Sequence, residues 1–459
     1  MVVHLTDDDL PPVLLFIGFA ALALCMPPQN DTWWHLRAGL EMINSGGILA
    51  TERFSHTNFG APLYHNHEWL TQLLFYGLFV AGGPVLLAVF CAACAVSAIA
   101  GAWRLVQGGP EARFGFLALM MVGCVVEWAI RPQVISLALF VVAVHLVLKG
   151  RDRWLPLLCV VWSNMHAVAI VGAVIAGCSA LEAVIWSRAR ARRAILIAAA
   201  CVLAAMATPQ GWHNWPRVVQ VVRTVRALHI HEYRSAFEIA QLPFWLTLLA
   251  LVLVVARKLP EAAERPRETR LLLVLAGVFA IAGALAVRNV PLFFMVGVPA
   301  LSRLLPLPAR RRTPKPAPAA AVLAGLMALI AAAGVAVAWT GGGARLGWKP
   351  MSASAIVAVR ECDGSLFNGF ADGGIVAWFV PERRIFVDSR GVEAYPIQLL
   401  LRSRETDLSG EYRQVFADFQ IGCAAVAANS PVVTRLREDP RFRQHYADDQ
   451  WAVFARVNP

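Results

Sequence analysis

Long apolar segments alternate with short polar ones through the first three quarters of the chain. A membrane-crossing helix needs about 17–25 mainly apolar residues, and most of these segments approach that length. Residues 154–166 form the shortest segment, so we expect this helix either to cross the membrane or to end partway through it. The pattern predicts about eleven membrane-crossing helices, over residues 12–27, 84–103, 114–130, 133–149, 154–166, 168–187, 192–208, 243–257, 269–287, 290–305 and 318–340.

Basic residues gather in every second loop between these segments. Short cytoplasmic loops carry an excess of Lys and Arg, so we expect these loops to face the cytoplasm. The alternation puts the N-terminus inside and the C-terminus outside, provided that residues 68–82 lie along the outer interface and Pro84 starts the next span. The basic loops are Arg104–Arg113, Lys149–Arg153, Arg188–Arg193, Arg257–Arg270 and Arg303–Lys315.

The pattern changes after Gly341-Gly342-Gly343, where charged residues become frequent. Short apolar runs between turn residues are typical of strands, and here they alternate with helical segments. We therefore expect a compact α/β domain outside the membrane over residues 341–459. Its predicted strands are Arg384–Val387, Ala424–Ala427 and Ala452–Ala455, and its predicted helices lie near Pro396–Arg404 and Val432–Arg437.

Cysteine usage agrees with this division. Seven of the nine cysteines lie in apolar segments, and only Cys362 and Cys423 lie in the tail. An external compartment permits disulfides, so we expect these two to pair. The predicted fold class is mainly α, with a polytopic helical membrane domain over residues 1–340 and the small α/β domain after it. Residues 27–83 form the first external loop, including an interfacial helix.

Composition supports a membrane protein. Hydrophobic residues make up 58% of the 459 residues and charged residues only 15%, whereas soluble domains carry about 25% charged residues. The net charge of +11 alone suggests nucleic acid, but the basic residues lie in short loops, which is a topology signal. We expect no nucleic-acid partner. Residues 1–10 lack a basic signal-peptide region, so the first apolar segment is expected to stay as a helix.

The first long polar stretch, Asp31 to Glu68, concentrates ionisable and aromatic side chains. Residues three and four apart share one face of a helix, and Asp31, Trp34, His35, Arg37 and Glu41 have that spacing. We interpret Asp31 as a catalytic carboxylate; the alternative is a plain helix N-cap. The candidate substrate-binding residues in this stretch are Trp34, His35, Arg37 and Glu68.

Further polar motifs fall on the same predicted outer side: Arg131-Pro132-Gln133, Ser163–His166, the loop from Thr208 to Gln241, and Arg288-Asn289. Polar groups at membrane depth are costly and usually functional, although Pro132 and Pro209 can also simply end helices. Asn164 and His166 either line a cavity or link helices. The candidate substrate-binding residues in this set are Arg131, Gln133, Asn164, His166 and Arg288.

The run Asp31-x-Trp33-Trp34-His35-x-Arg37, followed by Gly46-Gly47, Phe54 and Gly60-x-Pro62, resembles the first external loop of oligosaccharyltransferase catalytic subunits. Those subunits belong to the membrane glycosyltransferases with the C-type fold (GT-C), and uncharacterised bacterial relatives are also similar. The resemblance implies a polyprenyl-phosphate-linked sugar as donor and a functional acidic residue at Asp31. The second acidic motif usual in the family is represented only by Glu127 and Arg131-Pro132-Gln133.

The tail carries a second, fainter resemblance. Phe367-Asn368-Gly369-Phe370-x-Asp372-Gly373-Gly374, followed by Val387-Asp388-Ser389-Arg390, is similar to the aromatic-Asp-Tyr-Gly acceptor motif of oligosaccharyltransferases and the strand after it. The tryptophans and the tyrosine of that motif are missing here. The glycines are equally consistent with turns.

The chemistry of such a transfer explains the residue types. A carboxylate such as Asp31 can deprotonate or orient the acceptor, and cationic groups stabilise the leaving phosphate. Arg131 and Arg288 suit the second role, as do Arg217, Arg223, Arg226 and Arg234, for which a basic helix on anionic lipid is the alternative. His65 and His67 are weak candidates for holding a divalent metal, Mg or Mn; structural histidines are the alternative, because the spacing matches no closed zinc pattern.

Three functions follow from these patterns. The first is a glycosyltransferase that uses a polyprenyl-phosphate-linked sugar, inverts at the sugar, and acts at the periplasmic face of a bacterial inner membrane. The second is a transporter or flippase for lipid-linked glycans, which does not need Asp31 as a base. The third is a non-catalytic scaffold with the same fold that binds membrane lipids or proteins.

Overall fold

The computed structural model describes residues 6, 8–63, 66–125, 128–166, 170–213, 230–238, 241–258, 264–305 and 318–457. The chain forms two compact units. The helical unit consists of residues up to Met26, Ala88–Gly211 and His229–Trp339, and the mixed unit consists chiefly of Pro27–Leu87 and Thr340–Pro459. The polar loop predicted at residues 27–83 therefore belongs to the same unit as the C-terminal tail.

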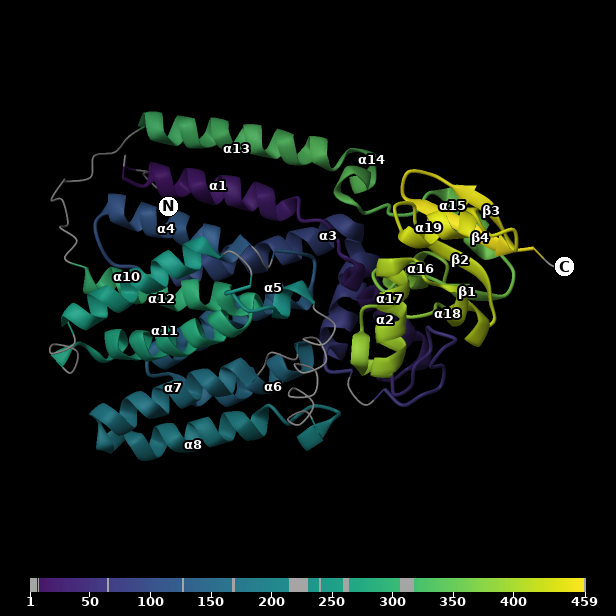
Figure 1. Cartoon of the computed structure of the whole chain (residues 1–459). Helices are drawn as coiled ribbons and strands as arrows, with labels where there is room; N and C mark the ends of the chain where they lie inside the picture. Colours follow the sequence, from purple (N-terminus) through teal and green to yellow (C-terminus); the bar gives the residue numbers. More distant parts are fainter. Residues whose placement is uncertain are drawn as a thin grey trace. The chain divides into compact units, whose positions relative to one another are not determined.

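The helical unit is built from apolar helices that pack side by side. Extensive contacts pair α7 with α8, α11 with α12, and α1 with α13 (Figure 1). Gly123 of α4 allows close packing on α12, because a Cβ there would lie 2.2 Å from the Phe294 ring. The helices are α1 (Leu10–Leu24), α4 (Pro110–Cys124), α5 (Pro132–Leu148), α6 (Leu155–Met165), α7 (Ile170–Trp186), α8 (Arg188–Ala204), α10 (Leu242–Lys258), α11 (Arg267–Leu285), α12 (Val290–Leu304) and α13 (Pro318–Ala338).

Helix α3 (Trp69–Trp103) is interrupted where the sequence predicts the end of an interfacial helix. Gly82 and Gly83 have non-helical backbone angles, and Gly83 adopts a φ of 63°, which glycine reaches without steric cost. Pro84 follows at once, and proline is tolerated at the start of a helix because it has no N–H to leave unpaired. The segment before Gly82 is thus a separate helix from the one after Pro84.

Each of the eleven predicted apolar segments overlaps a helix of the described chain. Within the described residues, three helical stretches are long and apolar enough to cross a membrane: Trp69–Trp103, which contains the break at Gly82 and Gly83, Arg267–Leu285 and Pro318–Ala338. Helix α6 has 11 residues and rises only about 16 Å, roughly half of a hydrocarbon core. Eleven crossings stay a prediction, whereas the mainly helical, apolar character is confirmed.

The mixed unit contains a four-stranded sheet with the order β1-β2-β4-β3. Strand β1 (Ser365–Phe367) pairs in parallel with β2 (Ile421–Ala427), and β4 (Trp451–Arg456) is antiparallel to both β2 and β3 (Phe442–Ala447). The small C-terminal α/β part is therefore confirmed. Its helices are α14 (Thr340–Gly343), α15 (Ala353–Glu361), α16 (Gly373–Phe379), α17 (Ile397–Ser409), α18 (Arg413–Asp418) and α19 (Pro431–Arg437), and α2 (Asn30–Ser45) joins them from the first loop. Along the whole described chain, in both units, short 3-10 turns occupy Asp152–Trp154, Gly211–His213, His231–Tyr233, Val287–Asn289, Ala344–Leu346 and Gly391–Glu393.

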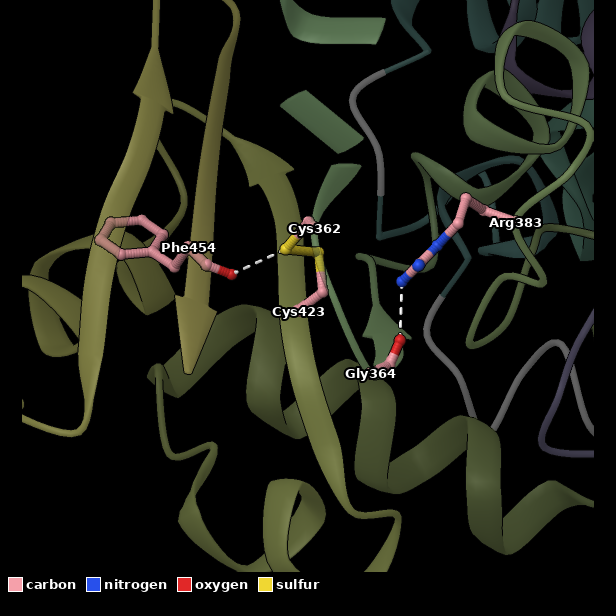
Figure 2. The surroundings of a disulfide bond; sticks show 5 residues. All are labelled: Cys362, Gly364, Arg383, Cys423 and Phe454. Atoms are coloured by element: carbon pink, nitrogen blue, oxygen red, sulfur yellow. Dashed lines mark hydrogen bonds between the residues drawn. A yellow bond between two sulfur atoms is a disulfide. The ribbon is translucent and has the colours of Figure 1, made fainter. Parts of the chain in front are cut away.

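A disulfide joins Cys362 to Cys423, as the sequence predicts (Figure 2). It fixes the end of α15 to strand β2, with a Cα–Cα distance of 5.7 Å. Cys362 Sγ lies 3.4 Å from the carbonyl oxygen of Phe454 in β4. The bridge therefore lies inside the packed tail, where both cysteines are buried.

The predicted strand Arg384–Val387 is wrong. Ile385, Phe386 and Val387 are fully buried, but they join no sheet strand. Ile385 instead forms an isolated bridge with Ser55: its N–H donates to Phe54 O, and His56 N–H donates to Ile385 O, both at 2.9 Å. The apolar run is extended and buried because it packs against the first loop, which the local pattern cannot distinguish from a sheet strand.

Candidate functional site

Asp31 lies in the first turn of α2, directly after the residue that begins the helix. The N-cap is Gln29, whose N–H donates to Thr32 Oγ1 at 2.9 Å in a capping box. Such a cap satisfies orphan donors at a helix start. The alternative interpretation of Asp31 as the N-cap is therefore wrong, and its carboxylate makes other contacts.

Those contacts come from two residues that are far apart in the sequence. Ser389 Oγ donates to Asp31 Oδ1 at 2.5 Å, and Trp34 Nε1 lies 3.2 Å from the same oxygen. Trp34 Nε1 also lies 3.1 Å from Ser389 Oγ, so the three side chains form a closed triangle. Hydrogen bonds to a carboxylate are stronger than those between neutral groups. Asp31 is therefore held in a defined orientation by both the first loop and the tail.

Two adjacent glycines make this arrangement possible. A Cβ on Gly374 would lie 2.4 Å from Asn30 O and 3.4 Å from Trp34 Cδ1, and a Cβ on Gly373 would lie 2.0 Å from Val387 O. Real Cβ atoms do not come so close to backbone oxygens. The glycines of the tail motif therefore let α16 pack directly on the start of α2, and they bring the segment with Ser389 against Asp31.

Arg390, next to Ser389, anchors the tail to the first loop. Its guanidinium lies 2.6 Å from Glu52 Oε2 and 2.7 Å from Asp388 Oδ2, and it also donates to Tyr395 Oη at 3.1 Å. Glu52 Oε1 in turn accepts the N–H groups of Phe54 and Ser55 at 2.7 Å. Burial raises the pKa of Asp388, while Arg390 opposes that rise. Breaking such a buried network leaves an uncompensated charge and costs several kcal/mol, about 3–5.

His35, Glu68 and His67 form a second group beside Trp34. His35 Nε2 and His67 Nε2 each lie 3.7 Å from a Glu68 carboxylate oxygen, and His67 Nδ1 lies 3.4 Å from Glu393 Oε1. Among the described residues, no set of three or more His, Cys, Asp or Glu side chains is arranged to hold a metal ion. His65 lies outside the described residues.

A small cavity, partly open to solvent, adjoins this group. Gln72 Oε1 is buried there and has no hydrogen-bond partner among the described residues. The wall therefore offers a ligand a buried acceptor in addition to carboxylates and an aromatic ring. It is lined by Trp34, Ala38, Leu49, Leu63, Asn66, Glu68, Gln72, Arg390 and Glu393. Arg37 instead pairs with Glu41 at 2.6 Å.

In the helical unit, two predicted arginines share one glutamate. Arg131 Nη1 lies 3.0 Å from Glu232 Oε2, and Arg288 Nη1 lies 3.4 Å from Glu232 Oε1. The Arg288 guanidinium also stacks 4.4 Å from the centre of the Tyr233 ring. Two guanidinium groups therefore converge on one carboxylate, and guanidinium groups are well suited to binding anionic ligands.

The other predicted residues of the helical unit connect helices. His166 Nδ1 and Ser136 Oγ lie 2.7 Å apart, and Trp162 Nε1 donates to the same Ser136 oxygen at 2.8 Å. Asn164 Nδ2 donates to Ala207 O at 2.7 Å. Gln133 Oε1 is buried without a hydrogen-bond partner among the described residues. Arg234 pairs with Glu238, and Glu127, Arg217, Arg223 and Arg226 lie outside the described residues.

Sequence reasoning missed Ser389, Arg390 and Glu52 as parts of this arrangement. The run Val387-Asp388-Ser389-Arg390 stood out only as a weak motif. The only available sequence signal was the charged Asp388-Ser389-Arg390 directly after an apolar run. No rule of residue spacing links this motif to Asp31. Glu232 and Glu393 were likewise missed, because each is a single acidic residue in a loop.

Neither a protein-family model nor a curated protein sequence matches this chain. Solved structures do match it over nearly its whole length. ArnT from Cupriavidus metallidurans bound to undecaprenyl phosphate is 13% identical with a TM-score of 0.51, covering 98% of this chain and 97% of that one. The Archaeoglobus fulgidus oligosaccharyltransferase tethered with an acceptor peptide is 11% identical with a TM-score of 0.53, covering 92% and 69%. The likeness shows that the chain has the C-type glycosyltransferase fold.

Proposed function

We propose that this protein is a membrane glycosyltransferase that transfers a sugar from a polyprenyl-phosphate-linked donor to an acceptor. The observation that carries the proposal is the Asp31 carboxylate, oriented by Trp34 and Ser389 in a chain with this fold. The similar ArnT structure binds undecaprenyl phosphate, which supports a lipid phosphate as the donor's carrier. The basic loops support action at the periplasmic face of a bacterial inner membrane, with the N-terminus in the cytoplasm.

In this proposal, an acceptor hydroxyl attacks the anomeric carbon of the sugar while the bond from that carbon to the phosphate oxygen breaks. The sugar inverts, and the lipid phosphate leaves with the bonding electrons. Asp31 takes the proton from the acceptor, a contribution typically worth about 10²–10⁴ in rate. The hydrogen bonds from Ser389 and Trp34 keep the carboxylate oriented, so that little reorganisation is needed during transfer.

For the helical unit taken by itself, the two arginines on Glu232 are proposed to bind a phosphate group of the lipid. A guanidinium offers a planar pair of N–H donors that matches a phosphate, and the two guanidinium groups lie together at Glu232. The cavity lined by Trp34 and Gln72 is proposed to accept hydroxyl groups of the substrate. Its buried carbonyl oxygen and its carboxylates are acceptors for hydroxyl donors.

A requirement for Mg²⁺ or Mn²⁺ stays a prediction. Removal of metal by EDTA, followed by readdition of either ion, tests it directly. Transfer that is lost and then restored would support such a requirement. Transfer that continues unchanged in EDTA would exclude such a requirement.

The proposed function is tested by Asp31→Asn in purified protein, with sugar transfer from a polyprenyl-phosphate donor as the readout. Asn keeps the shape but removes the charge, so transfer is expected to fall by about 10²–10⁴ with little change in melting temperature. Asp449→Asn makes the same chemical change at an exposed position of the same unit and serves as the control. Normal transfer by Asp31→Asn would contradict the proposal and leave the transporter or scaffold functions.

A further inference from the structure

One buried carboxylate in the helical unit faces three guanidinium groups. Glu182 of α7 has a fully buried side chain, and Arg190 of α8 lies 3.0 Å from its Oε2. Arg270 and Arg267, both of α11, lie 2.9 Å from Oε1 and 3.8 Å from Oε2. Three helices therefore converge on one negative charge. The transfer reaction makes no use of this cluster.

The cluster carries a surplus of two positive charges. Asp152 and Glu268 also act on Arg267, but each brings a further arginine, Arg193 at 2.7 Å and Arg303 at 3.1 Å, so the surplus of two remains among the described residues. Like charges held close together in a partly buried place destabilise each other unless an anion balances them. The arrangement therefore favours a negatively charged ligand.

The three arginines differ in how far they reach the surface. The side chain of Arg270 is 14% exposed, whereas those of Arg267 and Arg190 are 25% and 38% exposed. Arg270 makes two hydrogen bonds to Glu182 Oε1 and stacks 5.4 Å from the Trp186 ring. Arg270 thus balances the charge of Glu182 on the buried side of the cluster. Arg190 and Arg267 carry the surplus positive charge nearer the protein surface.

Apolar side chains continue from this charge along the surface of α7. Leu181, Val184 and Ile185 are all exposed and lie within one turn of Glu182. A free phosphate would balance the arginines but leave these side chains uncovered. A phospholipid matches both the arginines and the apolar side chains, because its headgroup carries a phosphate and its acyl chains cover apolar surface.

We propose that Arg190 and Arg267 form a binding site for the headgroup of an anionic bilayer phospholipid, at the ends of α7, α8 and α11. The bound phosphate supplies the second negative charge that Glu182 alone does not provide. It links α8 to α11 and so stabilises this end of the helical unit. Such basic sites between membrane helices are a known mode of headgroup recognition.

The test uses the full-length protein in phosphatidylcholine nanodiscs with or without phosphatidylglycerol. Native mass spectrometry counts the phosphatidylglycerol retained, and a melt reports the stability. Phosphatidylglycerol is expected to raise the melting temperature of the wild type. Arg190→Gln and Arg267→Gln are each expected to weaken its retention about fivefold, which is the effect of about 1 kcal/mol per basic residue. Arg192→Gln, an exposed arginine of the same helix, is the matched control.

Two results would overturn the proposal. If Arg192→Gln and Arg190→Gln lost phosphatidylglycerol equally, the lipid would be held by the general surface charge and not by a specific site. Equal stabilisation by inorganic phosphate in detergent would show a free-anion site. A salt titration of the wild type needs no variant: retention must fall as salt rises, and retention independent of salt would refute the site even if a variant failed to fold.

Discussion

Ser389 donates a 2.5 Å hydrogen bond to Asp31 across a separation of 358 residues. The bond joins the proposed catalytic carboxylate in the first loop to the C-terminal tail, within one compact unit. Trp34 completes the triangle by contacting both side chains. We therefore propose that the tail positions Asp31, and experiment can separate this role from a merely structural one.

Ser389→Ala removes one donor to Asp31 and leaves Trp34 in place. A hydrogen bond to a charged group contributes about 1.5–3 kcal/mol, so we expect kcat to fall about tenfold or more while KM changes little. Ser389→Thr keeps the hydroxyl and should restore most of the rate. Ser354→Ala, at an exposed position in α15, is the control. Equal rates for Ser389→Ala and wild type would show that the bond does not position Asp31.

Gly374→Ala adds a methyl carbon that would lie 2.4 Å from Asn30 O. Forcing an atom into a packed contact costs about 1–3 kcal/mol, so we expect a lower melting temperature together with slower transfer, because α16 would move away from Asp31. Gly47→Ala adds the same methyl group where nothing lies within 4 Å and should melt like the wild type. If both variants melted alike, the close contact between α16 and α2 would be contradicted.

Asp372 and Asp407 predict a pH dependence of stability in the tail. Burial, followed by the neighbouring Asp407 charge, raises the pKa of Asp372 to about 7, and burial raises the pKa of Asp407 to about 6. Both carboxyls have a pKa near 4 in the unfolded chain, so the folded state binds more protons between about pH 4 and 7. Stability contributed by this pair is therefore present at low pH and is lost as pH rises towards 7.

Melting curves from pH 4 to 8 measure this loss. The double variant Asp372→Asn with Asp407→Asn removes both titrating groups, so its pH dependence over this range should be flatter than that of the wild type. Glu405→Gln, an exposed acid of the same helix α17, should keep the wild-type dependence. An unchanged slope in the double variant would refute the assignment.

The Cys362–Cys423 bridge spans a sequence separation of 61 residues. A loop of this size typically gives about 2–4 kcal/mol of stabilisation, so reduction should lower the melting temperature of the wild type. The double variant Cys362→Ser with Cys423→Ser should melt at the lower temperature with or without reductant. Non-reducing peptide mapping that found both thiols free would contradict the bridge.

Local patterns predicted the parts of the fold that depend on local physics. Each apolar segment became a helix because burial and backbone pairing both favour helices in such segments. Strands β2 and β4 were found because their apolar runs lie between turn residues. Strand β3, Phe442–Ala447, was missed because most of its side chains are exposed and polar, and β1 was missed because it has three residues.

Only the residues of the candidate site that lie in α2 were predictable from the sequence. Asp31, Trp34 and His35 share a helix, so their spacing in the sequence places them together. Ser389 and Arg390 reach that helix through tertiary packing at Gly373 and Gly374. No periodic pattern in the sequence indicates a contact between two residues that are 358 positions apart. The same limit explains the error at Arg384–Val387, where the partner of the extended segment is the first loop.

The hydrogen bond between Ser389 and Asp31 also sets an order of events during synthesis. Chains grow from the N-terminus, so Asp31 leaves the ribosome long before Ser389 and the Gly373-Gly374 contact exist. A chain that stops early, or whose tail has not yet folded, lacks the Ser389 donor and the anchoring of Arg390 on Glu52. Full orientation of Asp31 thus waits for the last quarter of the protein, and an unfinished chain cannot assemble this site.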